Sequence, residues 1–199
     1  MMSMAMLEEG TRTFAPLADE DWPESIGHLR GTVAGRLNVY RTMAHHSALL
    51  AAWEPLRNHV VKHTALGKTF SEIVILRAGF RFGSAYEWSH HVSRGRACGL
   101  SDDRIASIAG PPENMAEDDR ILASAVDMLV ADQTLSPLAQ EQLLSLVGPE
   151  GIFDLIATFG FYTTLACVLK SFGTPLDTDV ANELAERPLS AGPPQMGAP

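Results

Sequence analysis

The chain has 199 residues, of which 46% are apolar and 20% charged, and its formal net charge at pH 7 is −9. This length and composition suit a single soluble globular domain with a sizeable core. The acidic balance argues against general nucleic-acid binding, because phosphates require a basic surplus. The two cysteines, Cys98 and Cys167, form no Cys-x-x-Cys, so the sequence predicts neither a zinc cage nor a dithiol redox pair.

Neither a secretory leader nor a membrane span is predicted. Residues 1–7 are apolar, but they lack a basic leader and are followed at once by Glu8 and Glu9. The longest uncharged apolar-rich run, residues 155–169, is too short to cross a bilayer. We therefore expect a cytoplasmic protein without a membrane partner.

Apolar residues at helical spacing divide most of the chain into helices. Residues 1–22 lack this spacing and are expected to form an arm. The spacing predicts a helix over about residues 31–44 and a second over residues 49–60. Pro55 is expected to kink or split the second helix, and Gly67 to end it.

The middle of the chain contains the clearest helix boundaries. Helices are predicted over residues 69–82 and 84–98, the latter stopped by Gly99, and a short one capped by Ser101 follows. Gly110-Pro111-Pro112 is interpreted as a loop within one domain.

The second half predicts four more helices. One begins at Asn114-x-x-Glu117, and one runs from Ser136-Pro137 to Gly148. Pro149 opens the longest helix, which ends at Gly173 and is apolar nearly all round, so it should be the central buried element. Residues 179–186 form the last helix, and residues 187–199 form a tail rich in proline and glycine that is expected to be disordered. No stretch alternates with a period of two, so the predicted fold class is all-α, with about eight helices in one domain over residues 23–186.

A serine, a glutamate and a histidine are spaced along one helix of this series. Ser84, Glu87 and His91 stand at i, i+3 and i+7, so their side chains project from one stripe. A hydroxyl, a carboxylate and an imidazole on one face can handle protons. The spacing of Ser84 and Glu87 is also that of a capping box, as is that of Thr69 and Glu72, and periodicity alone favours capping.

The same residues carry a resemblance to a known family. Glu72 is followed after eleven residues by Ser84-x-x-Glu87 and after three more by His91. This pattern resembles the signature of the carboxymuconolactone decarboxylase family, which includes the AhpD-like alkylhydroperoxidases. In the peroxidase branch Cys-x-x-Cys stands where Ser84 and Glu87 stand here. The decarboxylase-like branch tolerates a non-cysteine pair, and Tyr-Glu-Trp-x-x-His, as at residues 86–91, is typical of it.

The resemblance implies an AhpD-like helical bundle, a function and an assembly. The implied function is that of a cofactor-independent lyase of the carboxymuconolactone decarboxylase type, acting on a small carboxylated lactone or similar activated acid from aromatic-compound catabolism. His91, oriented by Glu87, would protonate the dienolate left by carbon dioxide, and Glu72 would shuttle a proton or fix the loop between the two helices. If apolar side chains surround Glu87, it could be the acid itself. The family also implies a homo-oligomer: a dimer, trimer or hexamer.

Substrate binding is assigned to three further residues. Arg77 is the candidate for holding the substrate carboxylate, and Ser84 or Tyr162 for donating to the carbonyl oxygen. The alternatives for Arg77 are an ordinary charged stripe or a pairing with an acidic residue inside the bundle.

Neither metal nor cofactor is expected. His59-x-x-x-His63 has ligand spacing but lacks a third ligand, and Glu87-x-x-His90 has no second Glu-x-x-His to complete a di-iron set. An AhpD-like peroxidase of the peroxiredoxin type is the alternative function. It is disfavoured because its chemistry needs thiols at the positions of Ser84 and Glu87. A non-catalytic helical oligomer that binds an apolar or acidic ligand is the third hypothesis.

Overall fold

The computed structural model describes residues 14–189, and within this range the chain is helical, with no β-strand. This part of the chain contains eight α-helices and four shorter turns of 3-10 or π-helix. The predicted all-α fold is therefore confirmed. Parts of the expected arm and tail, residues 1–13 and 190–199, lie outside the described residues. The α-helices are α1 (Asn38–Met43), α2 (Ser47–Asn58), α3 (Gly67–Arg81), α4 (Ala85–Ala97), α5 (Asp102–Ser107), α6 (Glu117–Asp132), α7 (Pro137–Phe172) and α8 (Thr178–Glu186); the short turns are η1 (Glu24–Leu29), η2 (Ala44–His46), η3 (His59–His63) and η4 (Pro112–Asn114).

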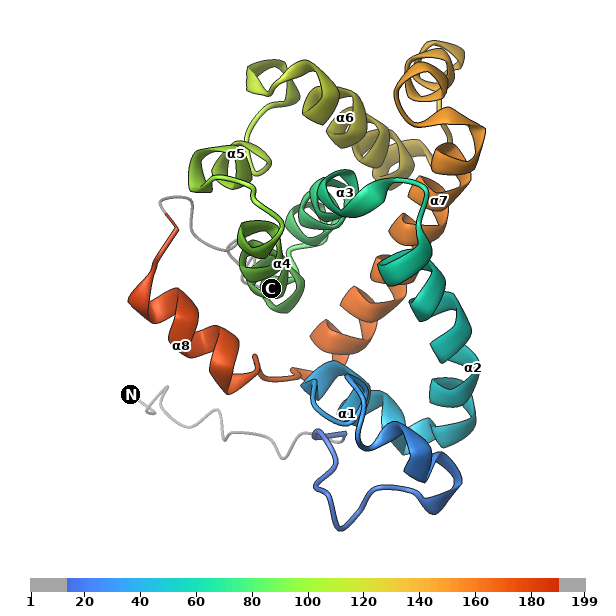
Figure 1. Ribbon diagram of the computed structural model, residues 1–199, viewed down its shortest axis with the longest axis vertical. Helices are drawn as coiled ribbons and strands as arrows, with labels where there is room; N and C mark the ends of the chain where they lie inside the picture. Colours follow the sequence, from blue (N-terminus) through green and yellow to red (C-terminus); the bar gives the residue numbers. More distant parts are fainter. Residues whose placement is uncertain (1–13, 190–199) are drawn as a thin grey trace, which may run out of the picture.

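Helix α3 lies at the centre of the molecule (Figure 1). It packs against α4, α6 and α7, and residues 73–79 are buried without a break. Gly79 lets α4 approach closely, since a Cβ there would lie 3.2 Å from the backbone N of Trp88. Gly83, with a φ of +59°, makes the turn between the two helices. As a result α3 and α4 form a tight hairpin.

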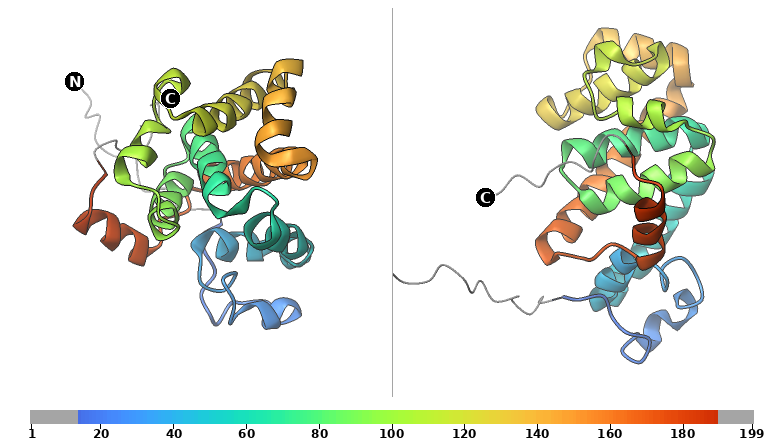
Figure 2. Two further views of the ribbon diagram at one scale, coloured as in Figure 1. Left: turned by 45° about the horizontal axis from the view of Figure 1, so that its top comes forward. Right: turned by 90° about the vertical axis from the view of Figure 1, so that its left-hand side faces the viewer.

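Two hydrophobic clusters make up the core. One joins α3, α4, α5, α6 and the first part of α7. The other joins η1, α1, α2 and the C-terminal part of α7. Figure 2 shows α6 and the first part of α7 at one end of the molecule, and η1 and α1 at the other. Because α3, α4 and α7 contribute to both clusters, the space between these three helices lies at the junction.

Helix α7 is two helical segments joined at Gly148, whose φ is +70° and ψ 179°. This agrees with the predicted helix end at Gly148 and the new start at Pro149. Ser136 caps the first segment, and Gly173, in the left-handed region at φ +57°, ends the second. By length and composition alone α7 would suit a membrane span, but both core clusters pack against it, as expected of a central helix.

Three predictions about helix boundaries are wrong. The first α-helix begins at Asn38 rather than near residue 31, since the Asn38 N–H donates to Asp177 Oδ1 at 3.0 Å. Pro55 does not split α2, which continues past it into the π-helical turn η3. Gly67, with a φ of +68°, begins α3 instead of ending the preceding helix.

Candidate active site

The α3–α4 hairpin brings Glu72 and His91 into contact. His91 Nδ1 lies 2.6 Å from Glu72 Oε2, and the two side chains are 2% and 14% exposed. The capping box predicted at Thr69 does not form, because α3 already begins at Gly67 and the Glu72 carboxylate is directed to the histidine. Two residues nineteen positions apart thus form one buried hydrogen-bonded pair.

Glu87 approaches the other nitrogen of the same ring. Its Oε2 lies 3.5 Å from His91 Nε2, and both side chains are almost completely buried. Glu87 Oε1 is buried and has no hydrogen-bond partner among residues 14–189. Ser84 Oγ accepts from the Glu87 N–H at 3.4 Å, but the Ser84 N–H donates to Gly79 O. Only half of the predicted capping box forms, and the carboxylate of Glu87 is left for the histidine.

The two carboxylates determine the protonation of His91. Burial alone would lower the pKa of His91, but the charge and hydrogen bond of Glu72, together with the hydrogen bond of Glu87, outweigh burial and raise this pKa above its ordinary value. The protonated ring is therefore favoured, and it can donate to Glu72 from Nδ1 and towards Glu87 from Nε2. The His91 imidazole therefore holds a transferable proton between two carboxylate acceptors.

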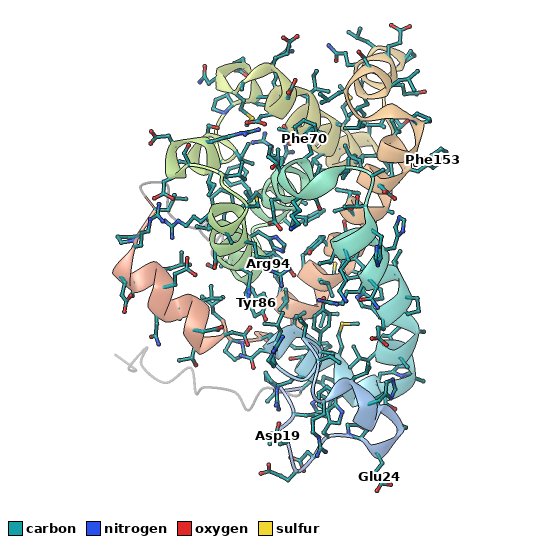
Figure 3. The ribbon with its side chains drawn as sticks, in the orientation of Figure 1. Asp19, Glu24, Phe70, Tyr86, Arg94 and Phe153 are labelled. Atoms are coloured by element: carbon teal, nitrogen blue, oxygen red, sulfur yellow. The ribbon has the colours of Figure 1, made fainter. Side chains whose placement is uncertain are left out.

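Tyr162 and Arg94 complete the surroundings of His91. The Tyr162 ring, from α7, meets the imidazole edge-on at 5.0 Å between centroids. Burial raises the pKa of Tyr162 well above its ordinary value, against the opposing charge of Arg94, so its hydroxyl stays protonated. Arg94 stands one turn after His91 on α4, in the middle of the molecule (Figure 3). In the described part of the chain, its guanidinium makes neither an ion pair nor a hydrogen bond.

These side chains separate two hollows. An open cleft of about 810 Å³ is lined by Glu72, Arg94 and Tyr162 within, and by the exposed Lys62 and Lys68 at its edge. A cleft of this size admits a small organic acid. On the inner side a pocket of about 20 Å³, too small for a substrate, is lined by Tyr40, Glu87, His91, Arg94 and Tyr162. Glu72 therefore faces the cleft, Glu87 the inner pocket, and His91 connects the two carboxylates.

Arg77 does not take the predicted role of carboxylate clamp. It is 3% exposed, and its Nε and Nη2 donate to Asp127 at 2.8 and 2.5 Å. Its Nη1 donates to the carbonyl oxygens of Ile108 and Gly110. The prediction is wrong because α3 turns this residue towards α6, where an acidic partner uses its donors. Arg94, which has no acidic partner among residues 14–189, is the inner cation of the cleft.

Ser84 is also separated from the cleft. It is 1% exposed and lines a different hollow, beside Lys170 and Leu176. The structure therefore brings together Glu72, Glu87, His91 and Tyr162, but not Ser84 or Arg77. Arg94 was missed as a site residue although its spacing signals it, since Glu87, His91 and Arg94 stand at i, i+4 and i+7.

Two other histidines, His90 and His59, have structural partners. His90 stacks on Tyr86, with 4.4 Å between centroids, and its Nε2 lies 2.9 Å from Asp177 Oδ2. This contact ties α4 to the segment before α8. His59 Nε2 lies 2.6 Å from Asp154 Oδ1. Over residues 14–189 there is no group of three or more histidine, cysteine or acidic side chains placed to hold a metal ion.

The helical bundle has the all-α AhpD-like fold, and its central hairpin carries the Glu–His–Glu array. Residues 47–129, from α2 to α6, match the model of the carboxymuconolactone decarboxylase family. The resemblance to this family predicted from the sequence is therefore confirmed over residues 47–129. No curated protein matches the chain in sequence.

Solved structures share the fold at low sequence identity. A variant of the debrominase Bmp8 in complex with 2,3,4-tribromopyrrole has a TM-score of 0.73 and 13% identity, covering 90% of this chain and 99% of that one. An uncharacterized peroxidase-related protein from Silicibacter sp. TM1040 has a TM-score of 0.71 and 17% identity, covering 89% of this chain and 97% of that one. These similarities establish the shared fold along nearly the whole chain.

Proposed function

We propose that this protein is a cofactor-independent carboxy-lyase of the carboxymuconolactone decarboxylase type, acting on a small carboxylated lactone or a similar activated acid. One observation carries the proposal. A histidine held between two carboxylates lies one turn from Arg94, which has no ion-pair or hydrogen-bond partner among residues 14–189. Both residues line the inner pocket, and Arg94 and Glu72 also line the open cleft. This arrangement supplies a cation for an acid substrate and a stored proton for its product.

Binding begins with the substrate carboxylate. Arg94 is the inner cation of the cleft, and Lys62 and Lys68 at its edge attract an anion from solvent despite the negative charge of the whole chain. A guanidinium meets a carboxylate through two parallel hydrogen bonds, so Arg94 both binds and orients it.

The reaction then breaks one carbon–carbon bond and forms one carbon–hydrogen bond. As carbon dioxide leaves, the bonding electron pair delocalises into the adjoining carbonyl, and the Tyr162 hydroxyl donates to the resulting enolate oxygen. Protonation at carbon consumes one proton. Glu72 is the member of the array that faces the cleft, so it relays this proton: the Nδ1 proton of His91 passes to the Glu72 carboxylate, which transfers it to the carbon and is a carboxylate again. The proton that His91 loses is recovered from solvent.

The experiment measures carbon dioxide release from a carboxymuconolactone and from a panel of lactone acids and keto acids. We expect turnover in the unmodified protein, a loss of about a hundredfold or more in Glu72→Gln and His91→Asn, and no change in the charge-matched surface control Arg120→Gln. Arg120 is half-exposed on α6, far in sequence from the hairpin. Full turnover in His91→Asn would contradict the proton path. Inertness of the unmodified protein towards every substrate would contradict the activity.

A thiol-dependent route has less support. Cys98 lines the cleft, but burial and the charge of Glu72 raise the pKa of its thiol, which disfavours the reactive thiolate. Cys167 is exposed on α7, so no resolving thiol is built beside it. Peroxide turnover with a dithiol donor should therefore be absent, and robust turnover would overturn the proposed chemistry.

We also propose that the protein is a homo-oligomer, assembled through the exposed apolar face of α7. Leu138, Leu144, Phe153 and Ile156 are 65%, 53%, 74% and 42% exposed, and Phe153 points outwards at the edge of the molecule (Figure 3). Leu144, Phe153 and Ile156 line one open apolar hollow, and exposed apolar side chains gathered in this way favour a contact with another chain. Light scattering on Phe153→Asp should show a smaller species than the unmodified protein. An unchanged mass would exclude this face as the contact.

A further inference from the structure

A second cavity lies on the other side of Tyr40 from the inner pocket. Its volume is about 270 Å³, and it lies between α2 and the segment from Leu29 to Tyr40. Tyr40 lines both this cavity and the inner pocket, but none of Glu72, Glu87 and His91 lines the cavity. Lys62 lines both this cavity and the cleft, so the cavity is a neighbouring site that shares its edge with the cleft but contains no member of the Glu–His–Glu array.

Donors without acceptors gather in this cavity. Trp53 and Arg57 stand at i and i+4 on α2, so their side chains lie on one face and both line it. The indole N–H of Trp53 and the Nε–H of Arg57 are buried, and neither has an acceptor in the part of the chain that the structure describes. Both groups only donate, and a buried donor without an acceptor is costly. Both N–H groups lie in the wall of the cavity rather than open to it, so a small turn of either side chain would let the acceptor oxygens of a ligand remove this cost.

The charges of the lining have the matching sign. Arg57, Arg36 and Lys62 contribute three cations, and Glu54 contributes one carboxylate. Arg36 and Lys62 are exposed and stand at the entrance, whereas Arg57 is partly buried. The net positive charge lies on an otherwise acidic chain, and local charge decides which ions approach.

The donors are held firmly in place. The Trp53 indole stacks on Phe161 of α7, with 4.6 Å between centroids. The Arg57 guanidinium lies 5.6 Å from the centroid of the Tyr40 ring, and its Nη1 donates to Asn58. Preorganised donors bind an anion with little loss of side-chain entropy.

We propose that this cavity is a second binding site, specific for a small oxyanion such as a carboxylate or a phosphate group, with Arg57 and Trp53 as its donors. A guanidinium favours the flat pair of oxygens that both groups present. The volume leaves room beyond the anionic group, so the ligand is a small organic acid or phosphate ester rather than a halide. Arg57 contacts Tyr40, and Tyr40 also lines the inner pocket together with Glu87. Tyr40 therefore stands between a ligand bound to Arg57 and Glu87.

The test is a titration of the full-length protein with inorganic phosphate, malonate and chloride, followed by calorimetry and by the indole N–H signals in NMR spectra. Trp53→Phe keeps the stacking ring but removes the donor, and it also assigns the Trp53 signal. Arg57→Gln removes the charge. Arg120→Gln removes one positive charge at a distance and is the matched control.

We expect phosphate or malonate, but not chloride, to bind with a dissociation constant in the millimolar range or below and to shift the Trp53 indole signal. Binding should weaken at least tenfold in Arg57→Gln and several-fold in Trp53→Phe, and it should be unchanged in Arg120→Gln. Whichever of phosphate and malonate binds more tightly identifies the anionic group.

Three results would overturn the proposal. The absence of binding at tens of millimolar excludes the site. Equal loss in Arg57→Gln and Arg120→Gln means an adventitious ion only. Binding that survives both cavity variants but is lost in Arg94→Gln places the anion in the catalytic cleft. If Arg57→Gln does not fold by circular dichroism, Trp53→Phe alone decides, since it preserves the packing on Phe161.

Discussion

Two arginines on neighbouring helices provide a sharp test of the site, because the structure gives them opposite roles. Arg77 is buried and forms a bidentate pair with Asp127, supplemented by two backbone carbonyl acceptors. Arg94 has no partner of this kind within the described residues and lines the cleft. Replacing each by glutamine should therefore affect different measurements.

The magnitudes follow from these partners. Arg77→Gln removes the buried hydrogen bonds to Asp127 and to two carbonyl oxygens, but Asp127 keeps Arg81 as a partner at 2.8 Å. The free energy of unfolding should therefore fall by about 1.5–3 kcal/mol, the contribution of a hydrogen bond to a charged group. Arg94→Gln breaks no such pair and should change stability by less than about 1 kcal/mol. It removes charge-assisted hydrogen bonds of about 1.5–3 kcal/mol each to the substrate carboxylate, which corresponds to a rise in KM of tenfold or more.

Urea unfolding followed by circular dichroism gives the first quantity, and steady-state carbon dioxide release gives the second. Arg94→Lys, which keeps the charge but not the bidentate geometry, should recover part of the loss. If Arg94→Gln unfolds as readily as Arg77→Gln, Arg94 has a structural role and the assignment of the clamp is wrong. A stable Arg77→Gln variant with a raised KM would restore the assignment predicted from the sequence.

Two further predictions concern the hairpin. Glu72→Gln should lower the pKa of His91. Because the His91 pKa is raised in the folded state, the stabilisation from Glu72 is present below about pH 6.5 and is lost as the pH rises through the folded pKa. The difference in free energy of unfolding between Glu72→Gln and the unmodified protein should therefore be larger at pH 6 than at pH 9. An equal difference at both pH values would contradict the ion pair. Gly79→Val should destabilise by about 1–3 kcal/mol, because its Cβ meets the backbone of Trp88 at 3.2 Å. Gly160→Ala is the control: its added Cβ would meet nothing within 4 Å, so it should leave stability unchanged or raise it. Thermal unfolding measures both glycine variants.

The sequence by itself determined the features that depend on neighbours along one helix. The cap at Ser84, the break at Gly148 and the left-handed stop at Gly99 are confirmed, because each depends on the backbone hydrogen bonds of a single turn. The contact between Glu87 and His91 belongs to the same group, since residues four apart lie on one face of a helix. Helical periodicity therefore sufficed for the fold class and placed Glu87 and His91 on one face, whereas their role in proton transfer was predicted from the family resemblance.

Only the tertiary structure decided the partners of the charged side chains. His91 meets Glu72 because Gly79 allows α3 and α4 to approach closely. Arg77 is occupied because α6 places Asp127 against it, and this leaves Arg94 as the cation of the cleft. A guanidinium is the same group at both positions, and the local sequence does not encode which carboxylate lies across the interior. Long-range packing sets the distance between each guanidinium and the nearest carboxylate. This distance decides whether the arginine forms a structural ion pair or is left to bind substrate.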